Sequence, residues 1–129
     1  MASQLKVDTI TGVTTAGSVA VTGEGNSTTT NLQQGLCKVW VNYDGTASGA
    51  ASRDSFNVSG QADNGTGDYT TSFTNNMNND DYACTFGANG PECEINAAGT
   101  SSLRKVSNSS GGSSIDKSVQ TLAINGDLA

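Results

Sequence analysis

The sequence predicts an all-β protein in which an extended N-terminal β-arm precedes an antiparallel β-sandwich or jelly-roll-like knob. Short strand-like segments recur between turn dipeptides such as Asp-Gly and Asn-Gly. No segment keeps the helical period of apolar residues, so we expect almost no helix. Only 34% of the residues are apolar and 14% are charged, and the polar remainder is rich in Ser, Thr, Asn and Gly, which suits turns and solvated β-surface.

Residues 1–31 are expected to form the arm, which serves as an attachment or trimerisation element. The stretch "SQLKVDTI" alternates apolar and polar residues, and "SVAVTG" does so again, which predicts two short strands joined by turn residues. The apolar residues of this arm are Leu5, Val7, Ile10, Val19 and Val21. They are too few to build a core, so the arm must pair with another chain or with the edge of a sheet.

Residues 32–129 are expected to form the knob. In "GLCKVWVNYDG" the alternation places Cys37, Val39, Val41 and Tyr43 on one face and Trp40 on the other. The segments that read as further strands are 54–60, 68–75 and 82–87, with weaker ones near 93–96, near 102–107 and in 118–129.

The stretch 55–76 combines a hairpin-like pattern with an unusually polar middle. We expect its apolar residues to face inward from two antiparallel strands, and "QADNGTGD" to connect those strands through an Asn64-Gly65 turn. The inward residues of this hairpin are Phe56, Val58, Tyr69 and Phe73.

Charge and hydropathy argue against two classes of partner, nucleic acids and membranes. The net charge is −6, and no basic residue lies between Arg53 and Arg104, whereas seven acidic residues do. Nucleic-acid binding needs clustered Lys and Arg, so we expect none, and a solvated acidic face is the simplest reading. No apolar run is long enough for a membrane span or a signal-peptide core, so we expect synthesis in a cytoplasm and no membrane association.

The chemistry-bearing residues do not form a catalytic pattern, and we expect no enzyme. The absence of histidine removes Ser-His-Asp and Cys-His machinery and the commonest zinc ligand. Two oxygen-rich loops, "DNGTGD" and "NNDD", contain Asp63, Asp68, Asp80 and Asp81. We interpret "DNGTGD" first as a hairpin turn, and Ca²⁺ is the one cofactor we consider, although the spacing is only a fragment of a calcium loop.

The cysteines and Trp40 leave alternatives open. Three cysteines, Cys37, Cys84 and Cys93, fit reduced thiols better than a disulfide framework. A hairpin over "TFGANGPE" would bring the last two together as a disulfide, and a metal site including Cys37 is the third alternative. Trp40 is the candidate for stacking on a sugar ring, whereas Tyr43 and Tyr69 alternate as core residues do.

Three stretches, "MASQLKVDTITG", "DSFNVSGQADNGTGDYTTSFTNNMNNDDYACT" and "INGDLA", resemble short fibre-like virion proteins of marine and cyanobacterial tailed phages. The likeness covers most of the chain, although residues 89–118 have no counterpart in it. It implies a homotrimeric, β-rich, non-enzymatic component of the virion, with an N-terminal anchor and a distal knob. It transfers no set of functional residues.

Three placements follow as hypotheses. In the first, the arm attaches to the tail or to an adaptor, and the knob of a tail or head fibre contacts host surface glycans. In the second, the arm spreads over the major capsid protein and the knob decorates and cements the head lattice. In the third, the chain is a carbohydrate-binding adhesin or lectin outside any virion. The weak core favours self-association in all three, because a domain with little apolar material is marginal alone.

Overall fold

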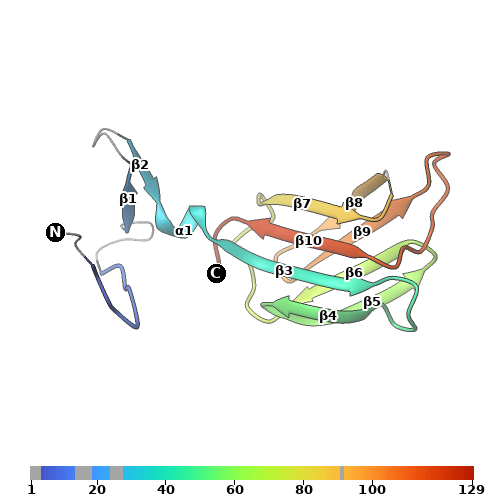
Figure 1. The fold of residues 1–129 in the computed structure, drawn as a ribbon, viewed down its shortest axis with the longest axis horizontal. Coiled ribbons are helices and arrows are strands. Elements are labelled where there is room, and N and C mark those ends of the chain that lie inside the picture. The colour runs from blue at the N-terminus through green and yellow to red at the C-terminus, as the bar shows by residue number, and fades with distance from the viewer. Residues whose placement is uncertain (1–3, 14–18, 24–27, 91) are drawn as a thin grey trace. The chain divides into compact units, whose positions relative to one another are not determined.

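The computed structural model describes residues 4–13, 19–23, 28–90 and 92–129, and the chain divides into two compact units after Leu36. The sequence placed this boundary after Asn31. Both units appear in Figure 1, and each is described by itself. The described residues contain one helix, of four residues, and the rest of the regular structure is antiparallel β-sheet. The prediction of a nearly all-β protein is therefore confirmed. No helix in the described part of the chain is long and apolar enough to cross a membrane.

The first unit contains a short hairpin and a helical turn. Strand β1 (Ala20–Thr22) pairs antiparallel with β2 (Thr29–Asn31), and α1 (Leu32–Gly35) follows directly. The Asn31 side chain caps α1 by accepting a hydrogen bond from the Gln34 amide at 3.1 Å. The second predicted strand of the arm is thus present as β1, whereas the first is wrong, because residues 4–13 contain no strand. Residues 1–3 lie outside the described part of the chain.

The second unit is a sandwich of two four-stranded antiparallel sheets that face each other (Figure 1). The first sheet has the order β4-β3-β10-β7 and the second has the order β5-β6-β9-β8. The strands are β3 (Cys37–Asp44), β4 (Ala51–Phe56), β5 (Val58–Gly65), β6 (Asp68–Phe73), β7 (Ala83–Ala88), β8 (Glu92–Ala98), β9 (Ser102–Asn108) and β10 (Gln120–Asn125). The chain crosses between the sheets four times, so that neither sheet is built from one continuous stretch of sequence.

Alternating side chains from both sheets make the core, as the period-two pattern predicts. On β3 the inward residues Val39, Val41 and Tyr43 are buried, and on β6 Tyr69 and Phe73 face them from the other sheet. The rings of Tyr43 and Tyr69 pack edge to face, with their centroids 5.3 Å apart. Further core residues are Ala50, Met77, Leu103, Leu122 and Ile124.

Cys37 is an exception to the predicted inward face of β3. It is exposed, although the alternation placed it beside Val39. The cause is an irregularity in pairing, because the register between β3 and β10 shifts between Ile124 and Asn125, opposite Cys37.

The predicted strand over residues 54–60 is wrong, because the chain changes sheets in its middle. Asn57 adopts a left-handed backbone conformation with φ +57°, which Asn tolerates better than most residues. Its side chain fixes the crossing, since Nδ2 donates to the Lys38 and Asn75 carbonyls and Oδ1 accepts from the Asn75 amide. As a result Phe56 ends β4 on the outer face of the first sheet, 52% exposed, whereas Val58 begins β5 and packs against the core.

The predicted loop over "QADNGTGD" is mostly strand. Residues Gln61 to Gly65 continue β5, and only Thr66 and Gly67 turn the chain into β6. The Gly67 backbone has φ +71°, its amide donates to Asp116 Oδ1, and its carbonyl accepts from the Ser107 amide. The expected hairpin exists, but its turn is formed by Thr66 and Gly67, directly after the predicted Asn64-Gly65 turn. It joins β5, not β4, to β6.

The last residues of the chain are held against the segment after β6. Met77 and Leu128 form a β-bridge, and the amides of Asn78 and Ala129 donate to the carbonyls of Asp127 and Asn76. Since Asn125 pairs with Cys37, the second unit begins and ends at the same end of its sandwich.

Candidate functional site

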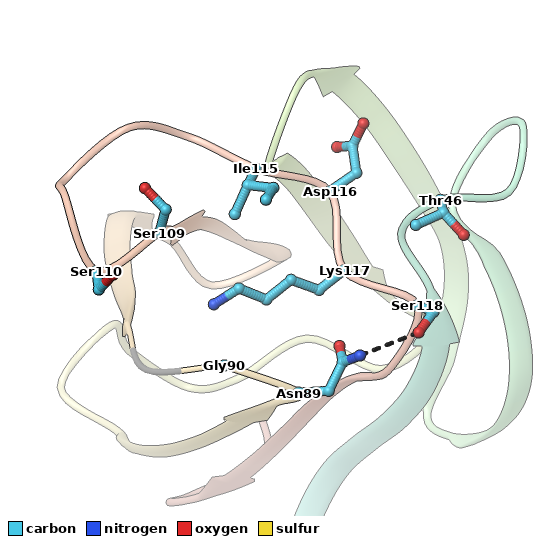
Figure 2. Close-up of a pocket in the computed structure, with 9 residues that line it drawn as sticks. All are labelled: Thr46, Asn89, Gly90, Ser109, Ser110, Ile115, Asp116, Lys117 and Ser118. Atoms are coloured by element: carbon cyan, nitrogen blue, oxygen red, sulfur yellow. Dashed lines mark hydrogen bonds between the residues drawn. The ribbon is translucent and has the colours of Figure 1, made fainter.

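A pocket of about 470 Å³ lies at the opposite end of the sandwich, between three loops. The loops follow β3, follow β7 and connect β9 to β10. Most of the residues that line the pocket carry short polar side chains or none, as Figure 2 shows. They are Thr46, Asn89, Gly90, Ser109, Ser110, Ile115, Asp116, Lys117 and Ser118.

Asn89 and Arg53 fasten the wall of the pocket that leads into β10. The Asn89 amide nitrogen Nδ2 donates to Ser118 Oγ at 3.1 Å, and its Oδ1 accepts from the Val119 amide at 3.2 Å. The Arg53 guanidinium donates to the Ser118 carbonyl at 2.6 Å and pairs with Asp44 at 2.8 Å. This part of the pocket is therefore bonded directly to two other segments of the chain, at Asn89 and Arg53, and through Arg53 to a third at Asp44.

Asp116 anchors the long loop between β9 and β10 to the core. Its Oδ1 accepts hydrogen bonds from the Tyr69 hydroxyl at 2.6 Å and from the Gly67 amide at 2.7 Å. The Tyr69 hydroxyl also lies 3.0 Å from the Gly45 carbonyl oxygen. The Tyr69 hydroxyl, and then the Gly67 amide, lower the pKa of Asp116, while burial and the Asp116 carboxylate raise that of Tyr69.

Lys117 lies across the middle of the pocket, and Figure 2 shows Asp116 pointing away from it. Lys117 is buried, and its chain passes close to Gly90: a Cβ at that glycine would meet Lys117 Nζ at 3.1 Å. Hydroxyl groups of Thr46, Ser109 and Ser110 complete the lining. Hydroxyls, an amide and an ammonium form hydrogen bonds with neutral or anionic polar groups, so the pocket suits a polar ligand such as a saccharide.

The core contains a second polar cluster, centred on Lys105. This residue is only 2% exposed, and its Nζ lies 3.3 Å from the Thr121 carbonyl oxygen and 3.5 Å from that of Gly87. It also lies over the rings of Tyr43 and Phe86, at 5.5 and 5.6 Å from their centroids. Burial lowers the pKa of Lys105 to about 8.

Trp40 lies on the outer face of the first sheet and does not line the pocket. It is 37% exposed and stands directly opposite Phe56 in the β3–β4 pairing, so both aromatic side chains are on the same face. Sequence reasoning singled out Trp40 alone, because it placed Phe56 in the core. The two together form an exposed apolar patch, which we name the Trp40–Phe56 patch.

The four aspartates considered for calcium do not come together. Asp63 lies on β5 and accepts from the Gly65 amide, and Asp68 begins β6 in an ion pair with Arg104. The Arg104 guanidinium is the main cause that lowers the pKa of Asp68. Asp80 and Asp81 lie in the exposed segment before β7. In the described part of the chain, no three His, Cys, Asp or Glu side chains are grouped so that they would hold a metal ion.

All three cysteines are free thiols in the structure. Cys84 lies on β7 and Cys93 on β8, and these strands pair with β10 and β9 and not with each other. The alternative of a hairpin that joins these two cysteines in a disulfide is therefore wrong, and the favoured interpretation as reduced thiols is confirmed. Burial raises the pKa of Cys84 to about 11, so its thiol stays protonated at neutral pH.

Of the arm residues, the structure places Leu5, Val7 and Ile10 in a segment without regular structure, 81%, 53% and 59% exposed. Val21 lies on β1 and is also exposed, and Val19 directly precedes that strand. Within the described residues of the first unit, no apolar side chain is buried.

Sequence reasoning missed the pocket residues and Lys105. Ser109 and Asp116 belong to a polar stretch with no motif, Asn89 lies in a separate segment after β7, and only the fold brings the three together. Lys105 did carry a signal, because the alternation of "SLRKVS" places it on the same face as Leu103, which is buried.

Comparison of the chain with protein-family models, curated proteins and solved structures gives no match.

Proposed function

We propose that the chain is a non-enzymatic structural protein of a tailed-phage virion, a short trimeric fibre-like component exposed on the particle. The observation that carries this proposal is the division into a first unit in which no described apolar residue is buried and a sandwich with its own core. Apolar side chains that find no core in their own chain are expected to be covered by a partner. The sequence resemblance to fibre-like virion proteins supplies the identity of that partner.

The arm is proposed to be the element that binds a phage structural protein. Its apolar residues and the short β1–β2 hairpin are suited to pairing with a sheet edge of a tail or adaptor protein. The same arm is suited to the major capsid protein, in which case the sandwich decorates and cements the head. The two placements differ in the particle surface that carries the protein.

Contact with host surface glycans is proposed for the displayed sandwich, and the polar pocket between the loops is the observation that favours it. The pocket takes precedence over Trp40 for this role, because a saccharide needs convergent hydrogen-bonding groups as well as an apolar surface. A soluble adhesin would use the same pocket without any virion.

Deletion of residues 1–31 is expected to leave a folded sandwich that no longer joins phage particles, because none of the described residues of the arm belongs to the core of the second unit. The measurement is incorporation of tagged protein into purified virions, with immunogold labelling to show whether tail or head carries it. As a matched control, Leu5, Val7 and Ile10 are replaced together by Ser in the full-length chain. Incorporation of the truncated protein would contradict the role of the arm, and absence of the full-length protein from virions would favour the adhesin.

Self-association is expected to depend on the Trp40–Phe56 patch. We expect the full-length protein to be a trimer at micromolar concentration, and the double substitution Trp40→Ser and Phe56→Ser to shift it toward monomer, because the patch is the largest pair of adjacent aromatic side chains exposed on the described sandwich. Light scattering coupled to size-exclusion chromatography measures this. Val119→Ser, which removes an exposed apolar residue outside the patch, is the control and should remain trimeric. A monomeric wild-type protein would refute the trimer.

A further inference from the structure

An amine and a thiol, those of Lys105 and Cys93, occupy diagonal positions on two adjacent strands of the second sheet, outside the pocket. Lys105 and Ser107 are two residues apart on β9 and both point inward, and Cys93 on β8 is directly opposite Ser107 in the register. Cys93 Sγ lies 3.8 Å from Ser107 Oγ. Diagonal neighbours on adjacent antiparallel strands are about 7–8 Å apart, a distance that a lysine side chain spans.

The surroundings of Lys105 hold its nitrogen in place without neutralising it. Two backbone carbonyls accept from it, and the rings of Tyr43 and Phe86 flank it. The groups that act on its protonation are the Cys93 thiol and the Lys117 ammonium. A carboxylate is not among them. Because burial opposes the ammonium form, the neutral amine is accessible near pH 8, and the neutral amine is the nucleophilic form.

The three thiols differ in their suitability for oxidation. Cys84 is half-buried in an apolar setting that raises its pKa to about 11, which leaves it unreactive. Cys37 is exposed, and its thiol donates to the backbone carbonyls of Val39 and Ile124 at 3.1 and 3.4 Å. Cys93 is half-buried on β8, which is an edge strand of its sheet, so a small apolar oxidant reaches it from one side.

We propose that Lys105 and Cys93 form a covalent nitrogen–oxygen–sulfur bridge when the reduced protein meets dioxygen. The overall step is R–NH₂ + R′–SH + O₂ → R–NH–O–S–R′ + H₂O. The O–O bond, the S–H bond and one N–H bond break, while N–O and S–O bonds form. Nitrogen and sulfur each give up two electrons, and these four electrons reduce dioxygen to the bridging oxygen and one water.

The bridge changes the energetics of the core. A nitrogen bonded to oxygen is a much weaker base than an alkyl amine, so the bridged Lys105 carries no charge at neutral pH. Oxidation therefore removes the ammonium that the folded state otherwise buries, and it ties the edge strand β8 covalently to β9. We expect the oxidised protein to unfold at a higher temperature than the reduced protein.

Intact-mass spectrometry tests the proposal on the full-length chain with Cys37→Ser, purified under reductant and then aerated at mildly alkaline pH. The expected result is a mass gain of one oxygen less two hydrogens, reversed by dithiothreitol, with peptide mapping that joins residues 93 and 105. The gain should be absent in Cys93→Ser and in Lys105→Met, and retained in the matched control Cys84→Ser. Circular dichroism shows that each variant is folded.

Three results would overturn the proposal: no mass gain after aeration, a gain of a whole oxygen without loss of hydrogen, which indicates a sulfenic acid, or the expected gain persisting in Lys105→Met. Because two variants remove different ends of the bridge, failure of one to fold still leaves the other as a test. The outcome is independent of where the protein resides on a particle.

Discussion

Replacing Gly67 by alanine is expected to destabilise the sandwich by about 3–4 kcal/mol, which combines the strain of a left-handed backbone with overpacking. Gly67 has φ +71°, and a Cβ there would lie 2.5 Å from the Ser107 carbonyl oxygen and 2.7 Å from the Ile115 nitrogen. Both are backbone atoms, so no side chain can turn aside. Relief requires β6 to move away from the β9–β10 loop, which stretches the bond from the Gly67 amide to Asp116.

Gly49 is the matched control for this substitution. Its φ is +72°, nearly the same as that of Gly67, but no atom lies within 4 Å of a Cβ built on it. Gly49→Ala should therefore lose only the backbone strain, about 1–2 kcal/mol. Urea denaturation of the two variants measures the difference, and equal losses would mean that the clash at Gly67 is absorbed by movement of the loop.

Replacing Lys105 by methionine is expected to stabilise the reduced protein by about 1–3 kcal/mol at pH 7, because an unbranched apolar side chain fills the same space without a buried charge. The lowering of the Lys105 pKa from 10.5 to about 8 corresponds to a cost of about 3 kcal/mol for burying the ammonium. Thermal unfolding measures the gain. Lys6→Met is the control, since Lys6 is exposed in the first unit and its replacement should leave stability unchanged.

The pH dependence separates the charge from the packing. Below about pH 8 Lys105 is protonated in both the folded and the unfolded state, and the full free-energy cost of burying its ammonium is present. Between about pH 8 and 10.5 the unfolded chain binds a proton that the folded chain does not, so the cost declines as pH rises. The advantage of Lys105→Met over wild type should therefore shrink across this interval. An advantage that stays constant with pH would assign the gain to packing alone.

The parts of the fold that the sequence predicts are those where one face of a strand is buried. On β3 and β6 a shift of one residue would expose Val41 or Tyr69, so period-two alternation specifies the register. The same alternation over Leu5 to Ile10 does not make a strand, because a strand also needs a partner for its backbone groups, and no other part of the described chain pairs with this segment.

The crossing at Asn57 and the pocket could not be predicted, for two different reasons. A single left-handed Asn moves the chain from one sheet to the other, and nothing in the local alternation of Phe56 and Val58 distinguishes a crossing from a continuous strand. The pocket joins residues 46, 89 and 116, whose proximity depends on the order of the strands in both sheets. Short polar residues with no fixed spacing carry no sequence signal for this proximity.

The pairing of Asn125 with Cys37 and the bridge from Met77 to Leu128 give the sandwich a polarity. Both ends of its chain leave from one pole, while the pocket occupies the other pole, beyond the far end of β3. With eight residues in β3, at about 3.3 Å per residue, the two poles are roughly 25 Å apart. A partner that binds the sandwich at either chain end would therefore leave the pocket facing away from that partner and accessible.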